Sequence, residues 1–211
     1  MPNLKAETRT RESPPAGITG VILAGGLGRR MGGIDKGLCK LRGKPMVAWV
    51  LERFAPQVGE VLINANQNLD AYARFGQRVI ADTIGGFAGP LAGLQRGLSE
   101  ARHPLVATVP CDSPFLPADL VVRLNAALQA QQAQLAVART GDQSHPVFCL
   151  CRRDVLPHLS EFLAGGGRKI DAWYATLRVT EVAFDDEPDA FSNINTPDEL
   201  RTFEDRAQRA R

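Results

Sequence analysis

A chain of 211 residues is long enough for one domain with a sizeable core, and 44% hydrophobic with 23% charged residues is ordinary for a globular protein. This composition excludes a collagen, a coiled coil and wholesale disorder. The 25 basic and 23 acidic side chains leave a net charge of +2. Because there is no global basic field, we do not expect a nucleic-acid partner.

The first seventeen residues mix charges of both signs with Ser13-Pro14-Pro15 and lack the apolar segment of a secretory signal. They predict a flexible tail (1–17) before a single domain (18–211). No stretch approaches the roughly 20 apolar residues that cross a bilayer, so no membrane partner is expected. The cysteines are interpreted as reduced thiols, and a cytoplasmic location follows from these features.

From Ile18 onward, short β-branched apolar runs alternate with amphipathic stretches. The first half predicts strands over 18–24, 60–64, 78–81 and 105–109, with helices over 45–56, 68–75, 90–101 and 117–132, the last expected to be the longest. The second half predicts strands over 135–138, 146–151 and 179–184 and a helix over 172–177. This rhythm indicates an α/β fold: a Rossmann-like, mainly parallel sheet flanked by helices, with mixed strand order in the C-terminal half.

Polar or glycine residues follow each of the first four predicted strands. Gly25, Asn64, Asp82 and Asp112 stand at these positions. In open parallel sheets, ligands bind outside the carboxyl ends of the strands. We therefore expect these residues to share one site.

The segment after the first strand is rich in glycine. Residues 23–36 hold five glycines together with Arg29, Arg30 and Lys36, a combination typical of a phosphate-binding loop. It is not a dinucleotide fingerprint, because Met31 stands where the third glycine belongs. Nor is there a P-loop, since Pro45 follows Gly43-Lys44 where serine or threonine is required.

Seven motifs resemble those of the molybdenum cofactor guanylyltransferases, a nucleotidyltransferase family, and the resemblance spans residues 18 to about 200. The opening motif alone is shared with other nucleotidyltransferases, whereas the combination is specific. The motifs are Leu23-Ala-Gly-Gly26, Arg30-Met-Gly-Gly-x-Asp-Lys-Gly-Leu38, Gly43-Lys-Pro45, Asn64-Ala-Asn66, Gly89-Pro-Leu-Ala-Gly93, Pro110-Cys-Asp112 and Asn193-Ile-Asn-Thr-Pro197.

The resemblance implies Mg²⁺-dependent transfer of GMP from GTP to the terminal phosphate of molybdopterin, with release of pyrophosphate. GTP and molybdopterin would be the substrates, with transient contacts to cofactor-biosynthesis proteins or acceptor molybdoenzymes. Asp112 would hold the metal, and Arg30, Lys36 and Asp112 would be catalytic. The resemblance assigns GTP binding to Leu23, Ala24, Gly25, Lys36, Asn64, Asp82 and Asp112.

Several of these residues have simpler structural interpretations. Asp112 could cap the helix that follows it, and Asp82, Asn64 and Asn66 are common turn formers. For the pterin substrate, the candidates are Asn193, Asn195, Arg168, Lys169 and His145, although a solvent-exposed loop explains the last three equally well.

Two other functions stay open at the level of sequence. A cytidylyltransferase of the same fold could act on molybdopterin or on another phosphorylated acceptor. A nucleotide-binding regulator without turnover would need neither Lys36 nor Asp112, and both are present.

Overall fold

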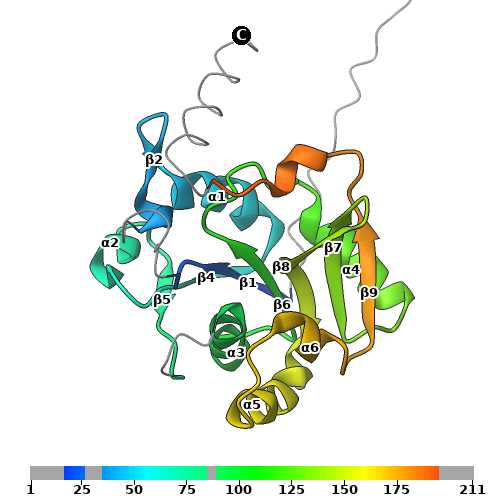
Figure 1. Ribbon diagram of the computed structural model, residues 1–211. Helices are drawn as coiled ribbons and strands as arrows, with labels where there is room; N and C mark the ends of the chain where they lie inside the picture. The colour runs from blue at the N-terminus through cyan, green and yellow to red at the C-terminus, as the bar shows by residue number, and fades with distance from the viewer. Residues whose placement is uncertain (1–16, 27–34, 85–88, 195–211) are drawn as a thin grey trace, which may run out of the picture.

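The structure is a computed structural model that describes residues 17–26, 35–84 and 89–194 (Figure 1). Its centre is a seven-stranded sheet with the spatial order β5-β4-β1-β6-β8-β7-β9. The strands are β1 (Ile18–Leu23), β4 (Glu60–Asn64), β5 (Arg78–Ile80), β6 (Leu105–Pro110), β7 (Leu135–Thr140), β8 (Gln143–Arg152) and β9 (Val179–Ala183). A separate hairpin pairs β2 (Lys40–Leu41) with β3 (Lys44–Pro45).

Strand direction divides the sheet into two parts. Strands β5, β4, β1 and β6 are parallel, whereas β8 runs antiparallel to both β6 and β7, and β9 is parallel to β7. The predicted α/β class, with a mainly parallel sheet and mixed strand order in the C-terminal half, is confirmed. The division into a tail (1–17) and a single domain (18–211) stays a prediction, since residues 1–16 lie outside the described ranges.

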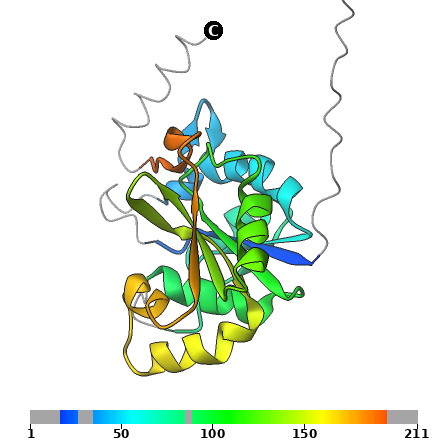
Figure 2. The same ribbon diagram turned by 90° about the vertical axis from the view of Figure 1, so that its right-hand side faces the viewer.

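Helices cover both faces of the sheet (Figures 1 and 2). Apolar side chains of α1 and α4 pack on one face, and those of α3, α5 and α6 pack on the other. The helices are α1 (Met46–Phe54), α2 (Leu69–Ala73), α3 (Pro90–Glu100), α4 (Leu120–Ala130), α5 (Leu156–Ala164) and α6 (Ile170–Tyr174). Short 3-10 turns are η2 (Lys36–Leu38), η3 (Ala55–Gln57), η4 (Arg153–Val155) and η5 (Pro188–Phe191).

The register of the parallel strands aligns their carboxyl ends. Leu23 of β1 pairs with Asn64 of β4 on one side and with Pro110 of β6 on the other, and Asn64 pairs with Ile80 of β5. The residues that follow these strands therefore emerge at one edge of the sheet.

The sequence-based prediction of a long helix over 117–132 was wrong in its start and in its length. Helix α4 begins at Leu120 and has 11 residues, the same length as α3. The reason lies in the buried side chain of Gln57, which donates to the Pro117 carbonyl at 2.9 Å and accepts from the Val121 N–H at 2.9 Å. A side chain distant in sequence thus sets where this helix starts.

Two elements were not predicted. The β2–β3 hairpin turns at Arg42 and Gly43, whose φ values of 52° and 77° are those of a type I′ turn. Helix α5 follows β8 after the 3-10 turn η4 and buries Leu159 and Leu163. Two predicted helices differ slightly in their bounds. The helix predicted over 45–56 is α1 (Met46–Phe54), and the helix predicted over 172–177 is α6 (Ile170–Tyr174).

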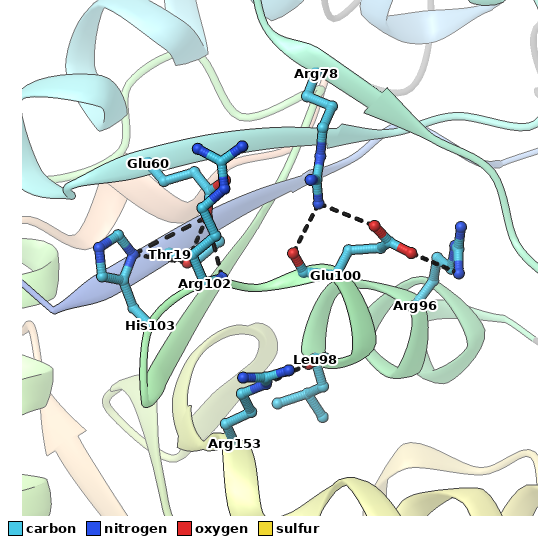
Figure 3. Close-up of polar contacts among 9 residues, drawn as sticks. All are labelled: Thr19, Glu60, Arg78, Arg96, Leu98, Glu100, Arg102, His103 and Arg153. Carbon is cyan, nitrogen blue, oxygen red and sulfur yellow. Dashed lines mark hydrogen bonds and ion pairs between the residues drawn. The ribbon is translucent and has the colours of Figure 1, made fainter.

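Arginine side chains fix the C-terminal end of α3, and Figure 3 shows these contacts. Arg78 of β5 donates to the Glu100 carbonyl at 2.7 Å and pairs with the Glu100 carboxylate at 3.0 Å. Arg153 donates to the Leu98 carbonyl at 3.1 Å. Cations at the last carbonyls satisfy their hydrogen-bonding capacity and complement the helix dipole. The other end of α3, which begins at Pro90, lies near the carboxyl ends of the parallel strands.

In the part of the chain that the structure describes, no helix is long and apolar enough to cross a membrane.

Candidate active site

A cleft with a volume of about 490 Å³ opens where the carboxyl ends of β1, β4 and β6 meet. This is the edge at which ligands bind in open parallel sheets. Its walls come from segments widely separated in sequence. They comprise Leu23, Ala24, Gly25, Gly26, Asp35, Lys36, Asn64, Asn66, Asp82, Gly89, Pro90, Pro110, Cys111, Asp112, Val147 and Asn193.

One wall carries an ion pair between Lys36 and Asp112. Lys36 is the first residue of η2, and Asp112 lies just beyond β6. The Lys36 ammonium donates to Asp112 Oδ2 at 3.1 Å, and the Asp112 side chain is only 10% exposed. The main chain at Asp112 is also held, because its carbonyl accepts from the Ile194 N–H at 3.0 Å. A cation and a carboxylate are thus placed together at the cleft.

The interpretation of Asp112 as a helix cap is wrong. Helix α4 begins at Leu120, eight residues further along the chain, and its N-cap position is occupied by Asp119. The Val121 N–H in its first turn is satisfied by Gln57. Asp112 instead lines the cleft, where its carboxylate is paired with the Lys36 ammonium.

The opposite wall is an amide–carboxylate cluster of Asn64, Asn66 and Asp82. The side-chain N–H groups of Asn64 and Asn66 each donate to one oxygen of Asp82 at 2.8 Å. The Asp82 N–H donates in return to Asn66 Oδ1 at 2.9 Å. Asp82 is thereby fixed in orientation although it is only partly buried. The structure brings Asn64 and Asp82 together as the sequence predicts. It also shows that Asn66, a member of the same predicted motif, binds both the side chain and the main chain of Asp82.

Two glycines let the backbone approach this cluster. A Cβ at Gly93 of α3 would lie 2.4 Å from Asn64 Oδ1 and 2.8 Å from Leu23 Cδ2, and a Cβ at Gly25 would lie 2.8 Å from Asn66 Nδ2. A larger residue at either position would therefore push these side chains out of place. Helix α3 begins with Pro90 at the cleft, and its N-terminus contributes partial positive charge there.

Asn193 closes the end of the cleft near Asp112. Ser113, which is fully buried, donates from its hydroxyl to Asn193 Oδ1 at 2.5 Å. The contact between Ile194 and Asp112 holds the same segment. The prediction that Asn193 belongs to the site agrees with its place in the cleft wall.

Other predicted residues do not line the cleft. Arg168 donates to the carbonyls of Leu163 and Gly167 at the end of α5, and Lys169 is the N-cap residue of α6. The ring of His145 stacks on Phe191 with centroids 4.5 Å apart, and burial lowers the pKa of this histidine. Their role in binding the pterin substrate stays a prediction. Arg30 and Asn195 lie outside the described residues.

Sequence reasoning missed Asp35 as a residue of the site. Its carboxylate accepts from the Tyr72 hydroxyl and from the Asn68 amide, and Asp35 lines the cleft next to Lys36. The available signal was its position directly before Lys36 in the glycine-rich segment. Its partners on and before α2 could be found only in three dimensions.

The MobA-like NTP transferase domain matches residues 20–179, which include the carboxyl ends of the parallel strands that form the cleft. The chain belongs to this family of nucleotidyltransferases, and the resemblance inferred from the motifs is confirmed.

Close relatives include a protein from Cupriavidus necator named molybdenum cofactor guanylyltransferase. It is 55% identical over 194 residues, which cover 90% of this chain and 97% of the relative. A protein of the same name from Shewanella amazonensis is 50% identical over 183 residues, covering 87% and 93% of the two chains. Both alignments thus extend over nearly the whole relative.

Solved structures share the fold. The molybdopterin-guanine dinucleotide biosynthesis protein A of Archaeoglobus fulgidus has a TM-score of 0.75 at 24% identity, with 90% of this chain and 99% of that chain covered. The 4-diphosphocytidyl-2C-methyl-D-erythritol synthase of Anaerococcus prevotii has a TM-score of 0.71 at 11% identity, covering 92% and 96%. At such identities these likenesses concern the architecture alone.

The contact between α3 and Asn64 gives a first test. We expect Gly93→Ala to destabilise the protein by about 1–3 kcal/mol through overpacking, and to weaken nucleotide binding because Asn64 must move. Gly97→Ala is the matched control: it lies one turn further along α3, and its Cβ would meet Val21 at 2.7 Å, remote from the cluster. Urea unfolding should show a loss for both variants, and calorimetric nucleotide titration a loss for Gly93→Ala alone. Equal nucleotide affinities would contradict the role given to this contact.

Proposed function

We propose that the protein transfers GMP from GTP to the terminal phosphate of molybdopterin, forming molybdopterin guanine dinucleotide and releasing pyrophosphate. The observation that carries the proposal is the placement of the Lys36–Asp112 pair and the amide–carboxylate cluster in one cleft. Support for this particular reaction comes from the 55% identity, over 90% of the chain, to a protein named for it.

The amide–carboxylate cluster is the proposed recognition site for the guanine nucleoside. Guanine has N–H groups that can donate hydrogen bonds to a fixed carboxylate such as that of Asp82. The Asn64 and Asn66 side-chain amides have both donor and acceptor groups for the base. In the adjoining turn, the Ala24 N–H donates to the Asn64 carbonyl at 2.7 Å, and the Leu23 carbonyl accepts from Cys111 at 3.1 Å. Because those main-chain groups already serve the sheet, we expect Gly25 to make the closest backbone approach to GTP.

Lys36 is the proposed phosphate-binding cation, with Arg30 assigned to the same task. The reaction is an in-line displacement at the α-phosphorus: the acceptor phosphate oxygen forms the new bond as the bond to pyrophosphate breaks. Such a reaction requires positioning and charge stabilisation rather than a covalent nucleophile on the protein. The Lys36 ammonium, already held at the cleft by Asp112, is placed to stabilise negative charge on the phosphates.

Asp112 is the proposed ligand of Mg²⁺. The donor set fits this ion, because Asp112 and the neighbouring Asn193 offer oxygen atoms. No group of three metal-binding side chains occurs within residues 17–26, 35–84 and 89–194. This suits an ion that binds through one or two carboxylates plus substrate phosphates and water. When bound, the metal would neutralise phosphate charge.

The remaining wall, with Asn193 and Val147, is where we place the phosphate end of molybdopterin. A cytoplasmic location, where GTP is available, and transient contacts with cofactor-biosynthesis proteins or acceptor molybdoenzymes complete the proposal.

The proposal is tested by supplying GTP, CTP, ATP and UTP in turn with molybdopterin and Mg²⁺ and measuring pyrophosphate. We expect GTP to be preferred over CTP by at least about a hundredfold, because a site built for a purine edge leaves buried groups unpaired with a pyrimidine. Equal use of CTP would instead make the protein a cytidylyltransferase. Nucleotide binding with no pyrophosphate from any donor would favour the non-catalytic regulator.

Replacing Lys36 tests the phosphate site. We expect Lys36→Ala to fold normally and to lose on the order of a hundredfold or more in turnover, since it removes a cation aimed at phosphate charge. Lys36→Arg should restore only part of this loss, because a planar guanidinium does not replace a compact ammonium. Thermal melts and steady-state pyrophosphate release are the measurements. Near-native turnover of Lys36→Ala would move the phosphates away from this wall.

Replacing Asp112 tests the metal site. Asp112→Asn keeps the side-chain size and removes the charge, so we expect a stable protein with a large fall in turnover that high Mg²⁺ partly restores. Asp119→Asn, at the start of α4 and outside the cleft, is the control and should leave the Mg²⁺ dependence unchanged. An Asp112→Asn enzyme with the Mg²⁺ profile of the wild type would remove Asp112 from the metal site.

A further inference from the structure

Asp35, immediately before Lys36, is held by two side chains from another part of the fold. The Tyr72 hydroxyl of α2 donates to Asp35 Oδ1 at 2.5 Å, and the Asn68 amide donates to Asp35 Oδ2 at 3.0 Å. Both oxygens of the carboxylate are therefore engaged on the side of α2. Asp35 also begins the 3-10 turn, since its carbonyl accepts from the Leu38 N–H at 3.1 Å.

Tyr72 is suited to act as a permanent donor. The residue is fully buried, and burial, followed by the nearby Cys111 and Asp35, raises the pKa of its phenol far above the ordinary value. The hydroxyl therefore keeps its proton throughout the working pH range. A buried hydroxyl bonded to a carboxylate makes one of the stronger hydrogen bonds in proteins.

Gly37, which follows Lys36, is also packed against Tyr72. A Cβ at Gly37 would lie 2.4 Å from the Tyr72 hydroxyl oxygen and 3.2 Å from Cys111 Sγ. Gly37 is thus enclosed between α2 and the end of β6. Lys36 stands between two residues that contact Tyr72, and its own ammonium reaches Asp112, directly after Cys111.

We infer that Tyr72 is a positioning residue for guanylyl transfer: by fixing Asp35 and Gly37, it sets the place of the Lys36 ammonium relative to Asp112. The inference rests on the proposed function, in which Lys36 acts on the GTP phosphates. Tyr72 is not among the residues that line the cleft, so its effect must pass through Lys36 and its segment.

The physical reason for an effect on rate is geometric. Without the hydroxyl, the exposed Asn68 amide is the one side-chain contact of the Asp35 carboxylate that stays among the described residues, and the carboxylate gains freedom beside Lys36. A mobile anion next to the cation competes with the substrate phosphates for it. Small displacements of a charge aimed at the reacting centre reduce turnover by large factors.

The test is a double-mutant cycle between Tyr72→Phe and Lys36→Ala. Phenylalanine keeps the buried ring and removes only the hydroxyl. We expect Tyr72→Phe to lower turnover at least about tenfold in the wild-type background and less than about twofold in the Lys36→Ala background, because residues that act as a unit are not additive. A similar loss in both backgrounds, or a change within twofold in the wild type, would overturn the inference.

Tyr174→Phe is the matched control. Tyr174 is also a buried tyrosine, and its hydroxyl donates to the Pro146 carbonyl at 2.7 Å, on a different part of the fold. Thermal melts should show a loss of stability for both tyrosine variants, whereas turnover should fall only for Tyr72→Phe. Equal losses of turnover would mean that the effect comes from stability alone.

A second variant keeps the inference testable if Tyr72→Phe folds poorly. Asn68 is exposed and has a φ of 51°, which glycine adopts without strain, so Asn68→Gly removes the amide and leaves the core intact. We expect a smaller loss of turnover in the same direction, again dependent on Lys36. No loss in Asn68→Gly together with an unfolded Tyr72→Phe would count against the inference.

Calorimetric GTP titration of the same cycle separates this inference from the proposed function. If wild-type protein binds GTP but makes no pyrophosphate with molybdopterin, the proposed reaction fails. A loss of GTP affinity in Tyr72→Phe that disappears in the Lys36→Ala background would still support the positioning role. Additive losses of affinity would overturn it.

Discussion

The alignment of three parallel strands at one edge of the sheet is the constraint on which the cleft depends. Hydrogen bonding places Leu23 level with Asn64 and Pro110, so that the glycine turn, the amide–carboxylate cluster and Asp112 emerge together. A shift of one residue in a strand would turn its side chains to the other face of the sheet. The chemistry of the cleft is therefore built on backbone register before any side chain contributes.

The two walls of the cleft differ in the interactions that hold their polar groups. On the amide–carboxylate side, Asp82 is fixed by two asparagine amides, which gives its carboxylate a defined orientation at a partly open surface. On the other side, Lys36 and Asp112 form an ion pair at 3.1 Å, so each charge has a partner within the protein. Tyr72 and Asn68 extend this arrangement beyond the cleft by holding Asp35, next to Lys36.

Local sequence predicted the strands well, because buried parallel strands are short apolar β-branched runs with clear ends; the predicted range 60–64 coincides with β4. It failed where distant residues decide the outcome. Gln57 holds the residues at the start of α4, which begins at Leu120. Helix α5 was missed although its leucines have helical spacing and a proline stands in its first turn. The β2–β3 hairpin was not predicted because its strands have only two residues each, too few to show an alternating pattern.

For the site, the sequence by itself determined the α/β class, the presence of a glycine-rich segment after the first strand, and the family motifs that single out Lys36, Asn64, Asp82 and Asp112. These are properties of residue type and spacing along the chain, which need no partner to be recognised. Only the tertiary structure decided that Asp112 faces the cleft, that Asn66 clamps Asp82, and that Asp35 is tied to Tyr72. The Asn66–Asp82 contact joins residues 16 positions apart, and the Tyr72–Asp35 contact joins residues 37 positions apart. Only the packing of helices on the aligned strands brings such partners within hydrogen-bonding distance.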